Sequence, residues 1–366
     1  MAHTSAPDQI VHVFDDAAAA EFAGKAIGYL NAGSVATLLS IGHQTQLFDT
    51  MAGLPPSRSD QIAGAAELNE RYVREWLSGL AVAEVIRYDP DHQTFWLPPE
   101  HAAFLTRAAG PNNIASTTQM LGMFGEVEQQ IIGCFKAGGG LPYSAYSRFH
   151  EIMASDSAAV VDSALLDQIL PLVDGITQRL ASGIAVADIG CGQGHAINVL
   201  AGAFPASHLT GFDFSPEAIT VARDEASTLG LTNVNFHVRD VATLDRMETF
   251  DLILAFDSIH DQAHPRAVLA NVYQALRPNG TFLMRDVKAS SVLEDNIELP
   301  WASFLYAAST MHCMSVSLGL GGEGLGTAWG EQLATDLLHA AGFNDVQLTG
   351  VDNDPFNTCY IAQKPT

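Results

Sequence analysis

The stretch VADIGCGQGH, residues 186–195, decides the fold. Its first four residues are mostly apolar, as in a buried strand, and three glycines follow at alternate positions. Glycine permits backbone angles and close approaches to a ligand that a Cβ atom would prevent. Residues 196–203 then favour a helix, whose first N–H groups and positive dipole end attract a ligand. The pattern predicts a strand, a ligand-binding turn and a helix.

A second short apolar segment, residues 209–213, ends in the carboxylate of Asp213. An acid at this distance from the glycine turn can accept hydrogen bonds from both hydroxyls of a ribose. A dinucleotide site would show the spacing G-x-G-x-x-G, whereas the glycines here alternate and Asp188 lies two residues before the first. The spacing therefore favours a different nucleoside cofactor.

Three segments further along the chain fit the same α/β domain. Residues 236–240 predict a third strand that ends at Asp240, and residues 250–257 predict a fourth. The sequence LRPNGTFLM, residues 276–284, predicts a turn and the start of a fifth strand. A helix over 331–341 and two strands near the C-terminus complete the expected order.

This order resembles that of class I S-adenosylmethionine (SAM) methyltransferases, and the matching motifs span residues 184–286. The resemblance implies SAM as the cofactor, S-adenosylhomocysteine (SAH) as the product, and a Rossmann-like, seven-stranded α/β domain with a final antiparallel strand pair. The positions that match the family's cofactor site are Asp188, Gly190, Gly192, Gly194, Asp213, Phe214, Asp240, Val241 and Phe256.

The first hundred residues have the outline of a winged helix. One helix is expected over 17–51, a second begins near 57, and a third covers 70–83. A hairpin of residues 85–88 and 94–97 follows them. This region resembles the dimerisation module of small-molecule O-methyltransferases, which implies a homodimer. DNA binding is disfavoured, because glutamates offset the arginines of the would-be recognition helix. We therefore expect a winged-helix domain (1–108), a helical linker (109–180) and the methyltransferase domain (181–366).

Composition sets limits on location and partners. The formal net charge of −24 disfavours nucleic acid and anionic membranes, and no apolar run is long enough to span a bilayer. Residues 1–7 lack the basic and apolar regions of a secretion signal, and the four cysteines are widely spaced. These features predict a cytoplasmic protein without nucleic-acid or membrane partners.

The chemistry is expected after the fourth strand, because open α/β sheets bind ligands at the carboxyl ends of their strands. His260 and Asp261 fall there, on the His-Asp pair of winged-helix O-methyltransferases, in which the histidine is the general base. Asp286, at the end of the fifth strand, takes the place of the acid that orients this histidine. For a further orienting acid, Glu298 and Glu323 are both open candidates. The resemblance implies methyl transfer to a small-molecule hydroxyl.

Other roles for His260 stay open. His260 and His264 have a spacing that binds metal on one helical face, but Pro265 suits the first turn of a helix and places both histidines in the preceding loop. We therefore expect no metal. The alternatives are an N- or S-methyltransferase, a metal-dependent enzyme that uses His260, His264 or His312, and a non-catalytic SAM-binding regulator.

The acceptor pocket is the least determined part. Three segments are candidates to line it: a methionine-rich helix, a glycine-rich break at 138–146 and the segment 306–330. The segment 306–330 resembles the corresponding segment of a bacterial and nematode branch of winged-helix methyltransferases, whose methyl acceptors are mostly unassigned. Candidate substrate residues are Met123, Tyr143, Tyr146, His150, His312 and Trp329.

Overall fold

The structure is a computed structural model that describes residues 14–352 and 354–366. The N-terminal stretch 1–7, in which we found no secretion signal, lies outside these residues. The chain divides into two compact units, Met1–Pro98 and Pro99–Thr366. The domain boundaries at 108 and 180 stay predictions. No helix in the described part of the chain is both long and apolar enough to cross a membrane.

The first unit has the predicted order of helices and a hairpin. Its elements are α1 (Asp16–Gln44), α2 (Leu47–Ala52), α3 (Ser59–Ala65), α4 (Glu70–Val82), β1 (Arg87–Asp89) and β2 (Thr94–Trp96). The two strands pair antiparallel and form the wing. The helical run predicted over 17–51 is interrupted, because Gln46 adopts a left-handed conformation (φ 60°) between α1 and α2. As the sequence indicated, Asn69 caps α4 by accepting a hydrogen bond from the Arg71 N–H.

The core of the first unit forms around Trp76. Its ring packs on Phe48 with 5.2 Å between centroids, and its indole N–H donates to the Leu38 carbonyl. Val73, Trp76, Leu77 and Leu80 of α4 are buried, as their helical spacing predicted. Val82, another apolar residue of α4, is 86% exposed. It lies off the stripe, because the i, i+3, i+4 series from Val73 does not include position 82.

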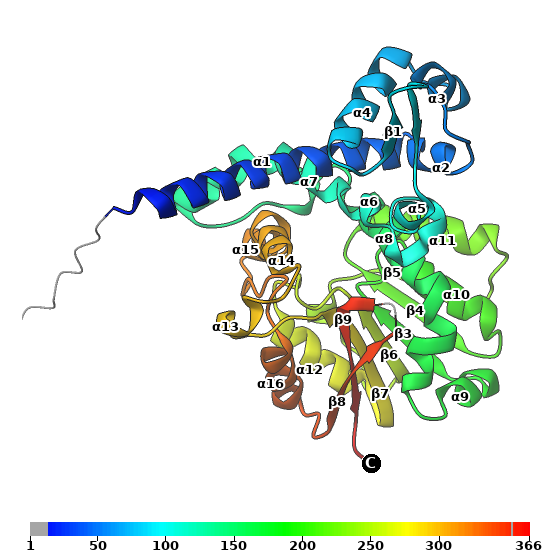
Figure 1. The fold of residues 1–366 in the computed structure, drawn as a ribbon. Helices are drawn as coiled ribbons and strands as arrows, with labels where there is room; N and C mark the ends of the chain where they lie inside the picture. Colours follow the sequence, from blue (N-terminus) through cyan, green and yellow to red (C-terminus); the bar gives the residue numbers. More distant parts are fainter. Residues whose placement is uncertain (1–13, 353) are drawn as a thin grey trace, which may run out of the picture. The chain divides into compact units, whose positions relative to one another are not determined.

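The second unit is built on a seven-stranded sheet with the order β5-β4-β3-β6-β7-β9-β8 (Figure 1). Its strands are β3 (Ala185–Ile189), β4 (His208–Asp213), β5 (Val234–Val238), β6 (Phe250–Phe256), β7 (Leu276–Val287), β8 (Val346–Val351) and β9 (Asp354–Gln363). Strands β3 to β7 are parallel, and β9 pairs antiparallel with both β7 and β8. This confirms the predicted fold class. The strand order reverses between β3 and β6, and ligands bind at such a switch point.

Helices account for most of the remaining second unit. The α-helices are α5 (Pro99–Ala102), α6 (Ile114–Thr117), α7 (Gln119–Ala137), α8 (Phe149–Ala164), α9 (Ile176–Ser182), α10 (His195–Ala203), α11 (Pro216–Thr228), α12 (Pro265–Ala275), α13 (Leu293–Asn296), α14 (Ala302–Ala308), α15 (Met314–Gly319) and α16 (Glu331–Ala341). A single π-helical turn, Ser309–Cys313, joins α14 to α15.

Both faces of the sheet are buried. In β6, Leu252 and Leu254 pack with residues of α10 and α11, whereas Ile253 and Ala255 pack with residues of α12 and α16. The two-residue period of a strand explains this division, because successive side chains point to opposite faces. The sheet is thus held between two helical layers, and its carboxyl edge is left for the site.

Replacing Phe282 with Ala should lower the free energy of unfolding by about 3–5 kcal/mol, the usual cost of removing a buried aromatic ring. Phe282 is fully buried in β7 and stacks on Phe343. Chemical denaturation followed by circular dichroism measures the change. Leu229→Ala, at a position that is 58% exposed, is the control and should change little. Equal losses in both variants would contradict this description of the core.

Candidate functional site

The glycine turn after β3 is shaped by packing on two sides. Gly190, Gly192 and Gly194 all have positive φ, which L side chains rarely adopt. A Cβ atom on Gly194 would lie 2.6 Å from the Ala222 side chain, so no larger residue fits there. A Cβ atom on Gly192 would meet no atom within 4 Å. The turn is therefore packed at its ends and open in the middle.

A cavity of about 150 Å³ lies over this open part of the turn. Seven of the nine predicted cofactor residues line it: Asp188, Gly190, Gly192, Gly194, Asp213, Phe214 and Phe256. Asp213 accepts hydrogen bonds from the N–H groups of Gly192 and Ser215, so the carboxylate is held at the rim of the turn. The structure brings together most of the residues that the motif marks.

Asp240 and Val241 do not line this cavity. The Asp240 carboxylate is exposed and accepts a hydrogen bond from the Ala242 N–H, where it caps a short 3₁₀ helix (Val241–Thr243). Val241 is buried in the apolar core between the sheet and α12. Their expected place beside the adenine ring stays a prediction.

Two neighbouring carboxyl groups in the cavity have raised pKa values. Burial, and to a smaller extent the charge of Asp213, raises the pKa of Asp188 to about 8. Burial also raises the pKa of Asp213, although the N–H groups of Ser215 and Gly192 oppose this shift. Low-dielectric surroundings disfavour a carboxylate that has no cation beside it. The cavity is therefore suited to a ligand that carries positive charge.

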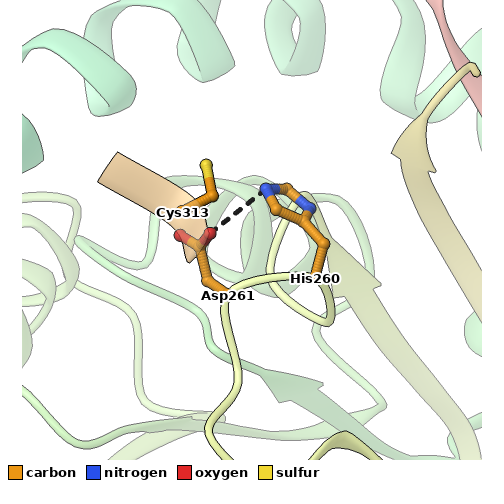
Figure 2. A group of neighbouring side chains, drawn as sticks. All are labelled: His260, Asp261 and Cys313. Carbon is orange, nitrogen blue, oxygen red and sulfur yellow. Dashed lines mark ion pairs between the residues drawn. The ribbon is translucent and has the colours of Figure 1, made fainter. Parts of the chain in front are cut away.

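His260 lies in the loop between β6 and α12 and is only 4% exposed. Its Nδ1 atom lies 2.7 Å from Oδ1 of Asp286 on β7, and the Trp329 indole N–H donates to the same oxygen. Its Nε2 atom lies 3.3 Å from Oδ1 of Asp261 (Figure 2). The structure brings His260 and Asp286 together, whereas Glu298 is exposed and Glu323 is paired with Arg266.

The environment of His260 stabilises the positive charge on its ring. Burial lowers the pKa of this imidazole, but the carboxylates of Asp286 and Asp261 more than offset this effect, and the pKa lies well above its ordinary value. Asp286 fixes the ring orientation because it occupies Nδ1. Nε2 faces Asp261, which lines the cavity, whereas His260 and Asp286 do not line it themselves.

The predicted substrate residues separate into two groups. Tyr143 and His150 line the cavity, and the Tyr143 hydroxyl donates to Oδ2 of Asp261 at 3.2 Å. The other four do not line it: Met123 packs in an apolar cluster, Tyr146 donates to the Met311 carbonyl, Trp329 bonds to Asp286, and His312 is fully buried.

The structure also adds residues that the motifs did not mark. Asp257 has a left-handed conformation (φ 50°) at the end of β6, lines the cavity, and is paired with Arg285 and Asn357. Ser258 donates to the Ile189 carbonyl at 2.9 Å and so links the loop that carries His260 to the glycine turn. An arginine inside the apolar fifth strand was the one sequence signal for this network.

His195 and His264 lie in different surroundings from His260. His195 lines the cavity, and its two ring nitrogens contact Glu225 and Asp162 at 2.6 and 2.8 Å. His264 is exposed and precedes α12, as the position of Pro265 indicated. The spacing of His260 and His264 therefore does not make one site.

Comparison with known proteins identifies both parts of the chain. Residues 33–107 match the Rv2258c-like winged HTH domain, and residues 180–342 match a methyltransferase domain. The chain is an S-adenosylmethionine-dependent methyltransferase with an N-terminal winged helix-turn-helix domain. The resemblance found in the sequence, and SAM as the cofactor, are thereby confirmed.

Relatives of this methyltransferase are similar over different lengths. A malonyl-[acyl-carrier protein] O-methyltransferase of Bacillus cereus is 29% identical over 128 residues, which cover 35% of this chain and 46% of that protein. The chain thus spans less than half the length of this curated relative. A putative O-methyltransferase of Nostoc punctiforme shares the fold with a TM-score of 0.70 at 18% identity, over 93% of this chain and 98% of that one.

Human N-acetylserotonin methyltransferase, solved in complex with SAM, also has this fold. Its TM-score is 0.68 at 17% identity, and the match covers 96% of this chain and 99% of the human one. At such identities the likeness establishes the fold alone. The acceptor of this methyltransferase has to be argued from its own site.

Replacing Asp188 with Asn should flatten the pH dependence of stability of the cofactor-free methyltransferase. A carboxyl with a pKa of about 8 in the folded chain binds its proton more tightly than in the unfolded chain. Its contribution to stability is complete below the unfolded pKa of about 4 and is lost as the pH rises toward the folded value. We expect the wild-type melting temperature to fall between about pH 5 and pH 8, and that of Asp188→Asn to fall less.

Thermal unfolding across this pH range measures the difference. Asp224→Asn, which changes an exposed carboxylate on α11, is the matched control and should follow the wild type. Parallel curves for wild type and Asp188→Asn would contradict the raised pKa.

Proposed function

We propose that the methyltransferase transfers the methyl group of SAM to a hydroxyl oxygen of a small molecule, with His260 as the general base. The observation that carries this proposal is the buried contact between Nδ1 of His260 and Asp286, which leaves Nε2 directed toward Asp261 at the edge of the cavity. A positioned imidazole of this kind can take the proton of an attacking hydroxyl.

Geometry and charge give the cofactor residues their proposed roles. Asp213 would accept hydrogen bonds from the ribose hydroxyls, and the glycine turn would contact the methionine part of SAM. The buried Asp188, whose pKa is raised by burial, gains a cationic neighbour from the ammonium and sulfonium groups of SAM. Asp240 and Val241 would contact the adenine ring.

The reaction is an in-line substitution at the methyl carbon. The acceptor oxygen forms a bond to this carbon while the carbon–sulfur bond breaks, and the sulfonium becomes the neutral thioether of SAH. The acceptor's proton passes to Nε2 of His260. Alignment of the two reactants supplies about 7–11 kcal/mol of the acceleration. Because the carboxylates favour a charged His260, only the neutral fraction reacts, and turnover should be faster above neutral pH.

The charges of the first unit support a small-molecule acceptor over a DNA-binding role. Arg58, Arg71 and Arg74 form ion pairs with Asp60, Glu75 and Glu70. Arginines that are paired in this way are less able to contact phosphates. A hydroxyl depends on a general base more than a neutral amine or a readily ionised thiol does, so the placement of His260 favours an oxygen acceptor. The cytoplasmic location stays an expectation that rests on four free cysteines.

A second copy of the chain is the proposed partner of α1. Among the described residues of this 29-residue helix, only Ser40, Gly42 and His43 are buried. Phe22, Ile27, Tyr29 and Leu30 are each more than 60% exposed. Apolar side chains gathered in this way usually mark a contact with another protein. We propose that α1 of a partner subunit covers them in a homodimer.

Methyl transfer can be tested with SAM that carries a labelled methyl group. Phenols, catechols, alcohols, carboxylates, amines and thiols are offered as acceptors, and products are identified by mass spectrometry. Label on a hydroxyl oxygen supports the proposal. Label only on nitrogen or sulfur overturns the acceptor class, and SAM binding without any transfer supports a non-catalytic regulator.

Replacing His260 with Ala should lower kcat by about 10²–10⁴, the usual contribution of a general base, while SAM affinity stays unchanged. Steady-state kinetics and calorimetry measure the two quantities. His264→Ala changes an exposed histidine of the same loop and should retain wild-type turnover. Full turnover in His260→Ala would remove this residue from the chemistry.

Introducing charge on the exposed face of α1 should separate the subunits. We expect the double variant Phe22→Glu, Leu30→Glu to run as a monomer in multi-angle light scattering, because two carboxylates would be buried in the proposed contact. Lys25→Gln, an exposed change on the same helix, should remain dimeric. A dimeric double variant, or a monomeric wild type, would contradict the role given to α1.

A further inference from the structure

A third side chain meets His260 and Asp261 from a distant part of the sequence. Cys313, at the end of the π-helical turn Ser309–Cys313, is buried beside them (Figure 2). One imidazole nitrogen, one carboxylate oxygen and the Cys313 Sγ atom all lie within 4.8 Å of one another. We refer to His260, Asp261 and Cys313 as the HDC cluster. Nitrogen, oxygen and sulfur ligands together are the set that zinc prefers.

The surroundings of His260 are those of a metal-ligating histidine. Such a ligand usually gives its other ring nitrogen to a carboxylate, which fixes the ring and raises its basicity. In this structure Asp286 contacts Nδ1 at 2.7 Å, and the Trp329 indole holds Asp286 in turn. Nε2 is the ring atom that faces Asp261, at 3.3 Å. The support needed for a metal ligand is therefore already built.

Several buried polar atoms next to the HDC cluster have no hydrogen-bond partner among the described residues. They are Oδ2 of Asp286, Oγ1 of Thr327 and both ring nitrogens of His312. A buried polar atom that nothing satisfies destabilises the folded chain. Nδ1 of His312 lies 3.9 Å from Oδ2 of Asp261. Unsatisfied groups gathered at one point indicate a ligand rather than chance.

The π-helical turn brings two consecutive residues into this region. A π-turn has more residues per turn than an α-helix, with hydrogen bonds from i to i+5, so successive side chains point less than about 100° apart. His312 and Cys313 are both buried, and both belong to this turn. Turns of this type occur often at functional sites. The backbone thus departs from α-helical geometry in the turn that contains Cys313.

We propose that the HDC cluster binds a single zinc-class ion through Nε2 of His260, a carboxylate oxygen of Asp261 and the thiolate of Cys313. Asp261 lines the cavity, so the site borders the space proposed for the cofactor and the acceptor. Ligand atoms around a tetrahedral zinc ion are roughly 3–4 Å apart, so small side-chain rotations complete the site. Asp261 and the thiolate balance the charge of the ion.

Occupation of this site changes the proposed reaction. The metal takes the electron pair of Nε2 that would accept the proton of the acceptor, so an enzyme with bound metal lacks its base. We therefore infer that the ion inhibits methyl transfer in competition with the acceptor. The inhibition of methyl transfer rests on the proposed function, whereas metal binding by the HDC cluster does not.

Cobalt(II) tests the site without any need for turnover. Full-length, metal-free protein is titrated with Co²⁺, and we expect a thiolate-to-cobalt charge-transfer band in the near ultraviolet that saturates at one equivalent. Cys313→Ser should abolish this band, and Asp261→Asn should weaken binding at least tenfold. Cys134→Ser and His264→Asn, which lie outside the cluster, should retain the band.

Each outcome decides whether the HDC cluster binds the ion. No band, or a band that survives in Cys313→Ser, overturns the site. Circular dichroism of each variant shows whether it is folded. If Cys313→Ser is unfolded, the extended X-ray absorption spectrum of zinc in the wild type decides by showing one sulfur ligand or none.

Turnover gives the second readout once an acceptor is known. One equivalent of Zn²⁺ should lower the rate at least tenfold, a chelator should restore it, and Cys313→Ser should be insensitive. A rate that rises with zinc would overturn competition and leave the metal site intact. If no acceptor is turned over, the proposed function fails while the cobalt experiment still decides the site.

Discussion

The parallel pairing of β3 with β6 is the constraint on which the rest of the site depends. Val186, Ala187 and Asp188 of β3 lie beside residues 252–254 of β6, so the two strands end at the same edge of the sheet. The glycine turn leaves one strand and the His260 loop leaves the other. Ser258 joins them through its hydrogen bond to the Ile189 carbonyl. The glycine turn and the His260 loop are therefore neighbours by topology.

Buried charge is concentrated around this edge. Arg285 is almost fully buried and is paired with Asp257 and Asp354, while Asn357 accepts a further hydrogen bond from it. Desolvated charges are costly unless each has a partner, so loss of one partner strongly destabilises the set. The network fixes Asp257, the first residue of the loop that carries His260, in its left-handed conformation. It gives the loop a rigid starting point.

The sequence predicted the parts of the molecule that local patterns encode. Apolar runs placed β3 to β6, and the family motif paired His260 with Asp286 before any contact was known. Patterns of spacing failed where tertiary packing decides the outcome. Trp329 packs on Asp286 and Met123 packs in an apolar cluster, instead of lining the cavity.

The approach of Cys313 to His260 could not be predicted for the same reason. It depends on how α14, the π-helical turn and α15 pack against the loop after β6, where Ser317 donates to the Gln262 carbonyl. No single motif contains that information. The metal spacing visible in the sequence, between His260 and His264, proved to join a buried residue to an exposed one.

Asp286 and Arg285 are adjacent in β7, so their side chains leave the strand on opposite faces. One face receives the imidazole of His260, and the other receives Asp257 and Asp354. A slip of β7 by one residue against both β6 and β9 would exchange the two charges. The guanidinium would then face the imidazole, and three carboxylates would face one another. The two residues that serve the site therefore also select the correct alignment of the sheet as it assembles.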